Sequence, residues 1–147
     1  MLMIKIKIQK INPDAELPHQ MTEHSSGYDL YSSNSKDIII KNGEVKLVHT
    51  GIAISLPIGY EAQIRPRSGL AIDHQIGVLN SPGTIDADYR GEIKIILFNF
   101  GKDDFIIKPK TRIAQMIISK YEEVNFVLTD KLDKTVRGNG GFGHTSY

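Results

Sequence analysis

The sequence predicts an all-β fold, a sandwich or barrel built from many short strands. Short runs rich in β-branched and aromatic residues recur along the chain, and turn-forming Gly, Pro, Asn and Asp residues separate them. Only one stretch, SGLAIDHQ at residues 68–75, has a helical pattern, and it is long enough for about two turns. Many short strands at this spacing are typical of β-sandwiches and barrels.

The strands follow from the distribution of apolar residues. Near the N-terminus, apolar residues at the even positions 2–8 alternate with mostly polar ones, which predicts a strand with one buried face. At the start of the short helix, Ser68 is expected to be the N-cap. Further β-rich runs predict strands at residues 37–40, 45–48, 51–56, 60–64, 93–100, 105–107, 113–118 and 124–128.

The segment NSPGTIDADYRGEIKI, residues 80–95, predicts a β-hairpin. Residues 88–91, DYRG, supply the turn between two β-rich arms. Strand alternation would then place Thr84, Asp86 and Asp88 on one face of the hairpin.

Length and composition predict a single domain of 147 residues: a β core at 1–128, a connector at 129–136 and a mobile tail at 137–147. The formal net charge of +1 gives no global field for nucleic acid or an anionic membrane. The absence of cysteine excludes disulfides and thiol chemistry and favours the cytoplasm. Lysines interrupt the apolar residues of MLMIKIKIQK, so no signal peptide is expected.

The glycine-rich tail RGNGGFGHTSY carries candidate binding chemistry. Glycine is costly to order, so we expect the tail to be mobile without a ligand. Its string GNGGFG matches the dinucleotide-binding pattern G-x-G-x-x-G, but it neither follows an expected strand nor opens a helix. Consecutive backbone N–H groups can nevertheless form an anion-binding nest, here beside Arg137. Two interpretations stay open, a flap that closes on phosphate and a disordered solubilising tail.

Two earlier segments carry candidate phosphate chemistry. In PRSGLA, residues 66–71, Arg67 and Ser68 lie at the start of the expected helix, where free N–H groups suit a phosphate, although an ordinary capped turn looks the same. In the expected hairpin, Asp86 could deprotonate a water held near a phosphate, or it could simply be solvated. Tyr89 could lie flat against a sugar or base.

The segments SSGYDL, residues 25–30, and RIAQMII, residues 112–118, complete the set. Gly27 marks a possible close approach of the backbone, and Asp29 is a hard oxygen group able to orient waters bound to magnesium. Arg112 and Gln115 could hold phosphate or water, or could be outward-facing residues of a core strand. The five histidines lack ligand spacing, so no dedicated protein-ligated metal site is expected.

Taken in order, SSGYDL, PRSGLA, GTIDADYRGE, RIAQMII and RGNGGFGHT resemble the five motifs of the trimeric deoxyuridine triphosphate nucleotidohydrolases, the dUTPases. Five motifs in order and spacing make this resemblance specific, and they run from residue 25 almost to the last residue. The resemblance implies a jelly-roll-like β fold and a homotrimer with active sites shared between subunits. It also implies Mg²⁺-dependent hydrolysis of dUTP to dUMP and pyrophosphate, which supplies dUMP for thymidylate synthesis and keeps uracil out of DNA.

The resemblance further implies roles by position. Asp86 would be the general base that activates water for attack on the α-phosphorus, and Tyr89 would pack under the deoxyribose. Asp29 would contact Mg²⁺ through water, with the metal otherwise held by the substrate phosphates. The other substrate contacts would be Asn80, Thr84, Ile85 and Lys94 at the uracil, Arg67, Ser68, Gly69 and Gln115 at the phosphates, and Arg137, Phe142 and Gly143 in the closing tail, with Phe142 stacked on the uracil.

Three positions depart from the family pattern: Ser26 replaces a common alanine, Gln75 a frequent glycine and His144 a frequent serine. Only His144 touches an implied contact, and a backbone N–H can serve from any residue there. The alternatives are a dCTP deaminase of the same fold, which has a glutamate in the region of Asp86, and a non-catalytic β-sandwich binding module. Asp86 and the full glycine tail favour the hydrolase over the deaminase, and a binding module would leave the five ordered motifs unexplained.

Overall fold

The structure is a computed structural model that describes residues 3–141, and within them it contains twelve strands and one helix. The all-β expectation is confirmed. The elements are β1 (Lys7–Lys10), β2 (His19–Gln20), β3 (Gly27–Tyr31), β4 (Ile38–Ile40), β5 (Val45–His49), β6 (Ile52–Ser55), β7 (Tyr60–Arg65), α1 (Ser68–His74), β8 (Ile76–Val78), β9 (Gly83–Ile85), β10 (Lys94–Asn99), β11 (Phe105–Ile107) and β12 (Arg112–Lys120).

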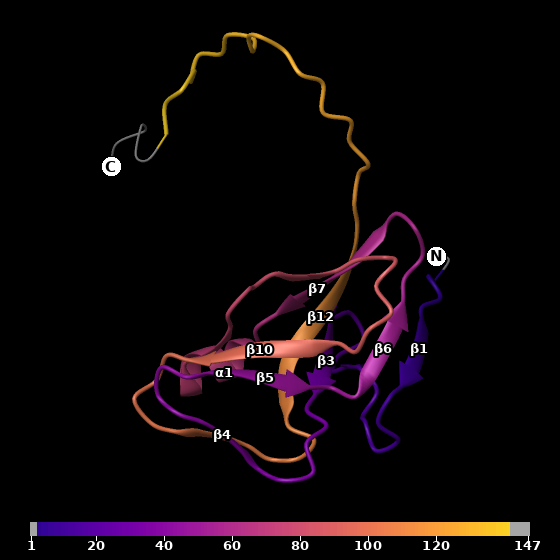
Figure 1. The fold of residues 1–147 in the computed structure, drawn as a ribbon, viewed down its shortest axis with the longest axis vertical. Coiled ribbons are helices and arrows are strands. Elements are labelled where there is room, and N and C mark those ends of the chain that lie inside the picture. Colours follow the sequence, from indigo (N-terminus) through magenta and orange to yellow (C-terminus); the bar gives the residue numbers. More distant parts are fainter. Residues whose placement is uncertain (1–2, 142–147) are drawn as a thin grey trace.

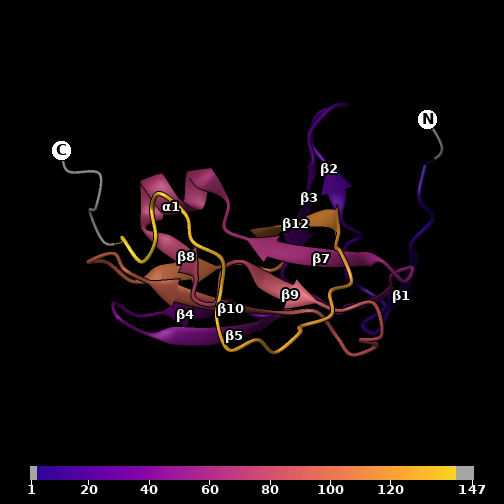
Figure 2. The same cartoon turned by 90° about the horizontal axis from the view of Figure 1, so that it is seen from above.

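The strands form a sandwich of two main sheets. The larger sheet has the order β2-β3-β12-β7-β9 and the smaller one the order β5-β10-β8, and all their pairings are antiparallel. Two-stranded pairs, β1-β6 and β11-β4, extend the layers. Figure 2 shows β5 and β10 lying below β7 and β12, with α1 at one end of the sandwich.

The core lies between the layers. Alternation along β10 sends Ile95 and Leu97 inward, where they are almost fully buried, and Ile64 of β7 and Met116 of β12 belong to the same cluster. Asn99 is also fully buried, but its amide nitrogen donates to the Ile40 carbonyl at 2.8 Å and its oxygen accepts from Gly101 N–H at 2.8 Å. A buried polar group satisfied in this way does not weaken the core.

The expected hairpin at residues 80–95 is wrong in its pairing. The first arm, β9, pairs with β7 in the larger sheet, whereas the second arm, β10, pairs with β5 and β8 in the smaller sheet. Turn residues and alternation identify strands and their faces, but they do not identify the partner strand. Here the half-buried Ile85 packs against the core from one sheet while Ile95 does so from the other.

Three local expectations also need correction. The first strand begins at Lys7, not at residue 2. The N-cap of α1 is Arg67, and it makes no side-chain capping bond, so Ser68 is the first helical residue. Three strands without a strong β-rich run, β2, β3 and β8, were missed because their pairing with neighbouring strands is not visible in the local pattern.

Residues 121–141 do not form the strand expected at 124–128. Figure 1 shows this C-terminal segment leaving β12 and running away from both sheets. Val124, Phe126 and Leu128 are exposed, the last at 99%, and the recorded hydrogen bonds of residues 122–141 all lie within that segment. A strand needs a partner backbone, and the described part of this single chain offers none to it. No helix among the described residues has the length and apolar character to cross a membrane.

Candidate active site

An arginine cluster, consisting of Asp29, Arg67 and Arg112, occupies the outer face of the larger sheet. Asp29 lies on β3, Arg112 begins β12, and Arg67 follows β7 at the N-cap of α1. The Arg67 Nε lies 3.3 Å from Asp29 Oδ1, and an Arg112 terminal nitrogen lies 3.1 Å from Asp29 Oδ2. Arg67 also donates to the Arg112 carbonyl at 3.2 Å. One buried carboxylate therefore holds two guanidinium groups side by side.

Gln115 attaches the segment preceding Arg67 to the same face. Its amide nitrogen donates to the Pro66 carbonyl at 2.9 Å. Its amide oxygen lies where a Cβ on Gly27 would be, at 2.3 Å from that position. Glycine at position 27 thus leaves room for the Gln115 side chain to cross from β12 over β3. The sequence indicated a possible close approach at Gly27, and the group that approaches it here is the Gln115 side chain.

Ser68 and Gly69 form the exposed start of α1, directly beside the arginine cluster. The first intrahelical bond runs from Ala71 N–H to the Arg67 carbonyl, so the preceding N–H groups have no partner within the helix. No acidic residue lies in the first turn of α1. The arrangement presents backbone donors and two cations to the same region, which suits a phosphate group.

Asp86 lies elsewhere, at the end of β9, and its side chain is exposed. It lines an open hollow of about 680 Å³ together with Ile58, Arg90 and Tyr121. A turn follows, in which Tyr89 N–H donates to the Asp86 carbonyl at 3.2 Å and the Tyr89 hydroxyl donates to the Glu92 carbonyl at 3.0 Å. The carboxylate is therefore accessible to water on a fixed turn.

The other residues expected at the uracil are spread around β9. Thr84 is exposed and lies beside Gln63 of β7, and Ile85 is half-buried. The Asn80 amide nitrogen lies 3.1 Å from the position of a Cβ on Gly83, so Asn80 packs against the start of β9. Lys94 begins β10 and pairs with His49, in the other sheet, because the hairpin does not form.

The pairing of β7 separates Asp86 from the arginine cluster within one chain. β9 runs antiparallel to β7, with Ile85 beside Ala62. Asp86 therefore continues toward the start of β7, whereas Arg67 lies beyond its end at Arg65. A strand rises about 3.3 Å per residue, so the positions of Ala62 and Arg65 alone are about 10 Å apart. A single chain does not bring the expected base to the expected phosphate groups.

Residues 137–141, the described part of the tail, make no recorded hydrogen bond with either group. Arg137 is exposed, and its Nε donates to the Gly140 carbonyl at 2.8 Å. Phe142 and Gly143 lie outside the described residues.

The described residues do not form a resident metal site. They contain no group of three or more His, Asp or Glu side chains that could hold a metal ion. Both oxygens of Asp29 are paired with arginines. This donor set fits a Mg²⁺ ion that arrives with a triphosphate, and it does not fit an ion ligated mainly by protein.

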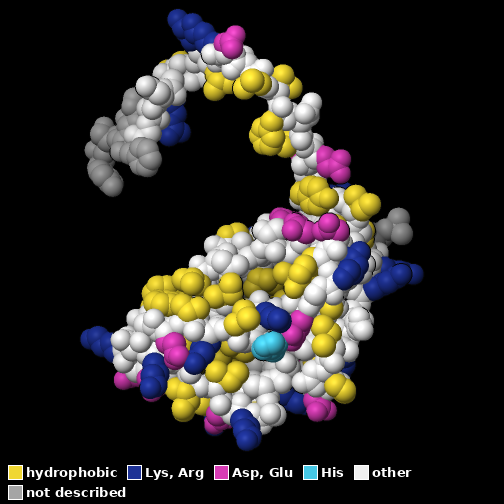
Figure 3. All heavy atoms as spheres, in the orientation of Figure 1, with side chains coloured by type: hydrophobic (Ala, Val, Ile, Leu, Met, Phe, Trp, Pro, Cys, Tyr) yellow, Lys and Arg dark blue, Asp and Glu magenta, His cyan; other side chains and the backbone are white. Residues whose placement is uncertain are grey.

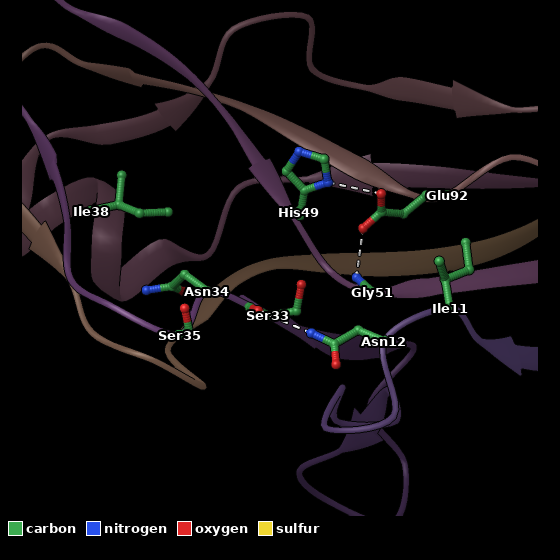
Figure 4. Close-up of a pocket in the computed structure, with 9 residues that line it drawn as sticks. All are labelled: Ile11, Asn12, Ser33, Asn34, Ser35, Ile38, His49, Gly51 and Glu92. Atoms are coloured by element: carbon green, nitrogen blue, oxygen red, sulfur yellow. Dashed lines mark hydrogen bonds and ion pairs between the residues drawn. The ribbon is translucent and has the colours of Figure 1, made fainter.

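Sequence reasoning missed the contacts of Glu92, whose carbonyl accepts the Tyr89 hydroxyl of the Asp86 turn. Figure 4 shows Glu92 between His49 and Gly51, at a hollow of about 420 Å³ lined by both polar and apolar residues. The Glu92 carboxylate lies 2.8 Å from His49 Nδ1 and accepts the Gly51 N–H at 2.8 Å. Gly51 has a φ of +70°, which glycine adopts readily. No local pattern links positions 49, 51 and 92, because the contact joins residues more than forty positions apart.

Comparison with known proteins shows the family of the chain. The family described as dUTPase matches residues 13–146. The chain is 60% identical to a deoxyuridine 5'-triphosphate nucleotidohydrolase of Rickettsia canadensis and 58% identical to one of Rickettsia felis, over 99% of each chain.

Solved structures show the same fold. A Staphylococcus bacteriophage 80alpha dUTPase with dUpNHpp has a TM-score of 0.88 at 20% identity, covering 97% of this chain and 99% of that one. A mutant dUTPase from phage phi11 of S. aureus, which reveals the coordination of a structural Mg(II) ion, has a TM-score of 0.79 at 18% identity, covering 88% and 99%.

Proposed function

The chain belongs to the dUTPase family and hydrolyses dUTP to dUMP and pyrophosphate, and we propose that its two polar groups carry this reaction from different subunits. The match of the dUTPase family to residues 13–146 is the observation that supports this activity. The arginine cluster with the start of α1 would hold the phosphates, and the Asp86 turn would hold the nucleoside and the attacking water.

Asp86 acts as the general base. It takes a proton from a water, the water oxygen forms a bond to the α-phosphorus, and the bond to the pyrophosphate oxygen breaks. Its exposure at the hollow beside Tyr121 supports this role, because the carboxylate can reach a solvent water. Mg²⁺ bound to the substrate phosphates would neutralise charge on the leaving pyrophosphate. Asn80, Thr84, Ile85 and Lys94 would contact the uracil, and Tyr89 the deoxyribose.

A homotrimer would join the two groups. The separation of Asp86 from the arginine cluster along β7 supports a site between subunits. An exposed apolar sheet face supports association: Leu47 is 53% exposed and Phe100 64%, beside the half-buried Ile96 and Phe98 of β10. Figure 3 shows hydrophobic side chains gathered on this side of the body and along the C-terminal segment. Patches of this kind mark protein–protein contacts.

The tail would act as a lid over the nucleotide of another subunit. The extended course of residues 121–141 away from its own body supports this proposal, because the end of the segment is free to reach a neighbour (Figure 1). Phe142 would stack on the uracil, and Arg137 with Gly143 would bind the γ-phosphate. In this proposal residues 1–128 are the core, residues 129–136 the connector and residues 137–147 the lid. The last strand, β12, ends earlier, at Lys120. The absence of cysteine supports a cytoplasmic location.

One assay separates the candidate functions. Purified protein is incubated with Mg²⁺ and each deoxynucleoside triphosphate in turn, and pyrophosphate and ammonia are measured. We expect far more pyrophosphate from dUTP than from dCTP, because the reversed hydrogen-bonding edge of cytosine leaves site groups unpaired and is rejected by about 10⁴-fold, and dTTP is excluded because its 5-methyl group would collide with the segment that binds the uracil. Ammonia released from dCTP would instead identify a deaminase.

A further inference from the structure

We propose that Glu92 is a positioning residue for the nucleoside: its carboxylate anchors the turn at residues 86–91 to the connection between β5 and β6 and thereby fixes the ring of Tyr89. This inference rests on the proposed function, in which Tyr89 packs under the deoxyribose. A ring in that place leaves no room for a 2'-hydroxyl, so its position decides how strongly the site prefers dUTP over UTP. Glu92 acts through Tyr89 and not by contact with the substrate.

The hydrogen bonds of the turn are the first observation. Tyr89 N–H donates to the Asp86 carbonyl at 3.2 Å, and the Arg90 guanidinium donates to two carbonyls of the same turn, at 2.6 Å and 2.9 Å. Within the described part of the chain, the recorded hydrogen bonds of residues 86–91 all end inside the turn or at Glu92. On its C-terminal side the turn therefore depends on Glu92 for its first hydrogen-bonded link to the rest of the fold.

The seat of the Tyr89 ring is the second observation. Its hydroxyl donates to the Glu92 carbonyl at 3.0 Å, and a Cβ on Gly91 would overlap the hydroxyl oxygen. The ring therefore lies against the backbone of residues 91–92, and 43% of the residue stays exposed to receive a sugar. Because the hydroxyl is bound to the Glu92 carbonyl, a movement of that carbonyl would move the ring.

The anchor of the Glu92 side chain is the third observation. One carboxylate oxygen accepts the Gly51 N–H at 2.8 Å, the other lies 2.8 Å from His49 Nδ1, and the side chain is only 15% exposed (Figure 4). Gly51 is itself fixed, because its carbonyl accepts the backbone N–H groups of residues 11–12 at 2.7 Å and 3.1 Å. A continuous set of hydrogen bonds therefore joins the N-terminal segment, Glu92 and the Tyr89 ring.

The strand that follows does not depend on this carboxylate. Ile93 N–H donates to the Ile52 carbonyl at 2.9 Å, and the Thr50 hydroxyl donates to the Ile93 carbonyl. Loss of the Glu92 carboxylate should therefore leave β10 and the core in place and release only the turn that precedes them. Such a change alters the geometry offered to the sugar without unfolding the protein.

The test measures kcat/KM for dUTP and for UTP with the same preparation of each variant. The ratio of the two values does not depend on how much of the protein is folded, so a merely structural role would leave it unchanged. Glu92→Met keeps much of the side-chain volume and removes both oxygens, whereas Glu92→Gln keeps an oxygen for the Gly51 N–H. Glu44→Met is the matched control: the Glu44 carboxylate also accepts a backbone N–H, from Lys41 at 2.9 Å, and pairs with a lysine, but it lies at the opposite end of β5 from His49.

We expect Glu92→Met to lower the preference for dUTP over UTP by about tenfold, the size of effect that one hydrogen bond can produce. Glu92→Gln should keep at least about half of the wild-type ratio, and Glu44→Met should match the wild type. An unchanged ratio in Glu92→Met would overturn the proposal. So would a loss of the same size in Glu44→Met, because the effect would then not be specific to the turn.

Tyr89→Phe keeps the test decisive if Glu92→Met fails to fold, because it removes only the hydroxyl bonded to the Glu92 carbonyl and leaves the ring. It should lower the ratio by a similar factor, and the double variant should lose no more than either single one, since both changes break the same connection. An unchanged ratio in Tyr89→Phe, or losses that add fully in the double variant, would contradict the role given to Glu92. Wild-type protein that releases no pyrophosphate from dUTP would instead refute the proposed function, an outcome read before any variant is compared.

Discussion

At the scale of single residues, the carboxylates of Asp86 and Asp29 differ in their exposure and in their partners. Asp86 is exposed in a hollow and pairs with no cation in the described structure, so it is free to accept a proton from water. Asp29 is buried, and each of its carboxylate oxygens lies near a different arginine. The same side chain can therefore serve as a base at one position and as a support at another.

The role of Asp86 predicts the behaviour of Asp86→Asn. The amide keeps the shape of the carboxylate but cannot accept the proton, so kcat for dUTP should fall by at least about 10²-fold. Because Asp86 is exposed and outside the core, the melting temperature and the Kd for dUpNHpp should stay close to the wild-type values. Full activity in this variant would mean that another group takes the proton.

Gln75 gives a prediction about stability. It follows α1 with a φ of +53°, a left-handed conformation that costs a non-glycine residue about 1 kcal/mol or more. Gln75→Gly removes that cost but loses a hydrogen bond to the Ile72 carbonyl and loosens the unfolded chain, so the net gain should be at most about 1 kcal/mol. Ala71→Gly, inside the same helix, is the matched control and should lose about 1 kcal/mol. Chemical denaturation measures both, and a destabilised Gln75→Gly would contradict the strain argument.

At the scale of elements, the sequence predicted strands better than it predicted their partners. The runs at 45–48, 60–64 and 113–118 became β5, β7 and β12, and in β7 and β12 the alternation matches one buried face. The hairpin at 80–95 failed because each arm pairs in a different sheet, and pairing depends on residues distant in sequence. The arginine cluster was available as separate candidates, but only the register of β3 with β12 shows that they meet on one carboxylate.

The C-terminal segment gives a prediction at this scale. Removal of residues 137–147 should leave the melting temperature without ligand within about 2 °C of the wild-type value. The reason is that the described residues 137–141 make no recorded hydrogen bond with the sheets, and surface changes of this kind have small effects. Activity on dUTP should nevertheless be lost, because the lid contributes to the nucleotide site. A large drop in melting temperature without ligand would show that the segment is part of the folded core.

At the scale of the whole molecule, the geometry of one chain is incomplete. The arginine cluster lies beyond the end of β7, Asp86 lies toward its start, and residues 122–141 run away from the sheets (Figure 1). Apolar side chains on β5 and after β10 remain exposed. These features are explained together if neighbouring subunits cover the apolar sheet face and each site takes its parts from more than one chain.

Mixing two inactive variants tests this assembly. Chains with Asp86→Asn and chains lacking residues 137–147 are denatured in equal amounts, refolded together and assayed for pyrophosphate release from dUTP. If the base and the lid come from different subunits, each has an even chance of being intact, so roughly one quarter of the sites should be whole. The control is the same pair mixed without unfolding, which should stay at the background of the two variants as long as subunits do not exchange. Activity that remains at background after refolding, with trimers verified by sedimentation, would show that the base and the lid of each site come from the same subunit.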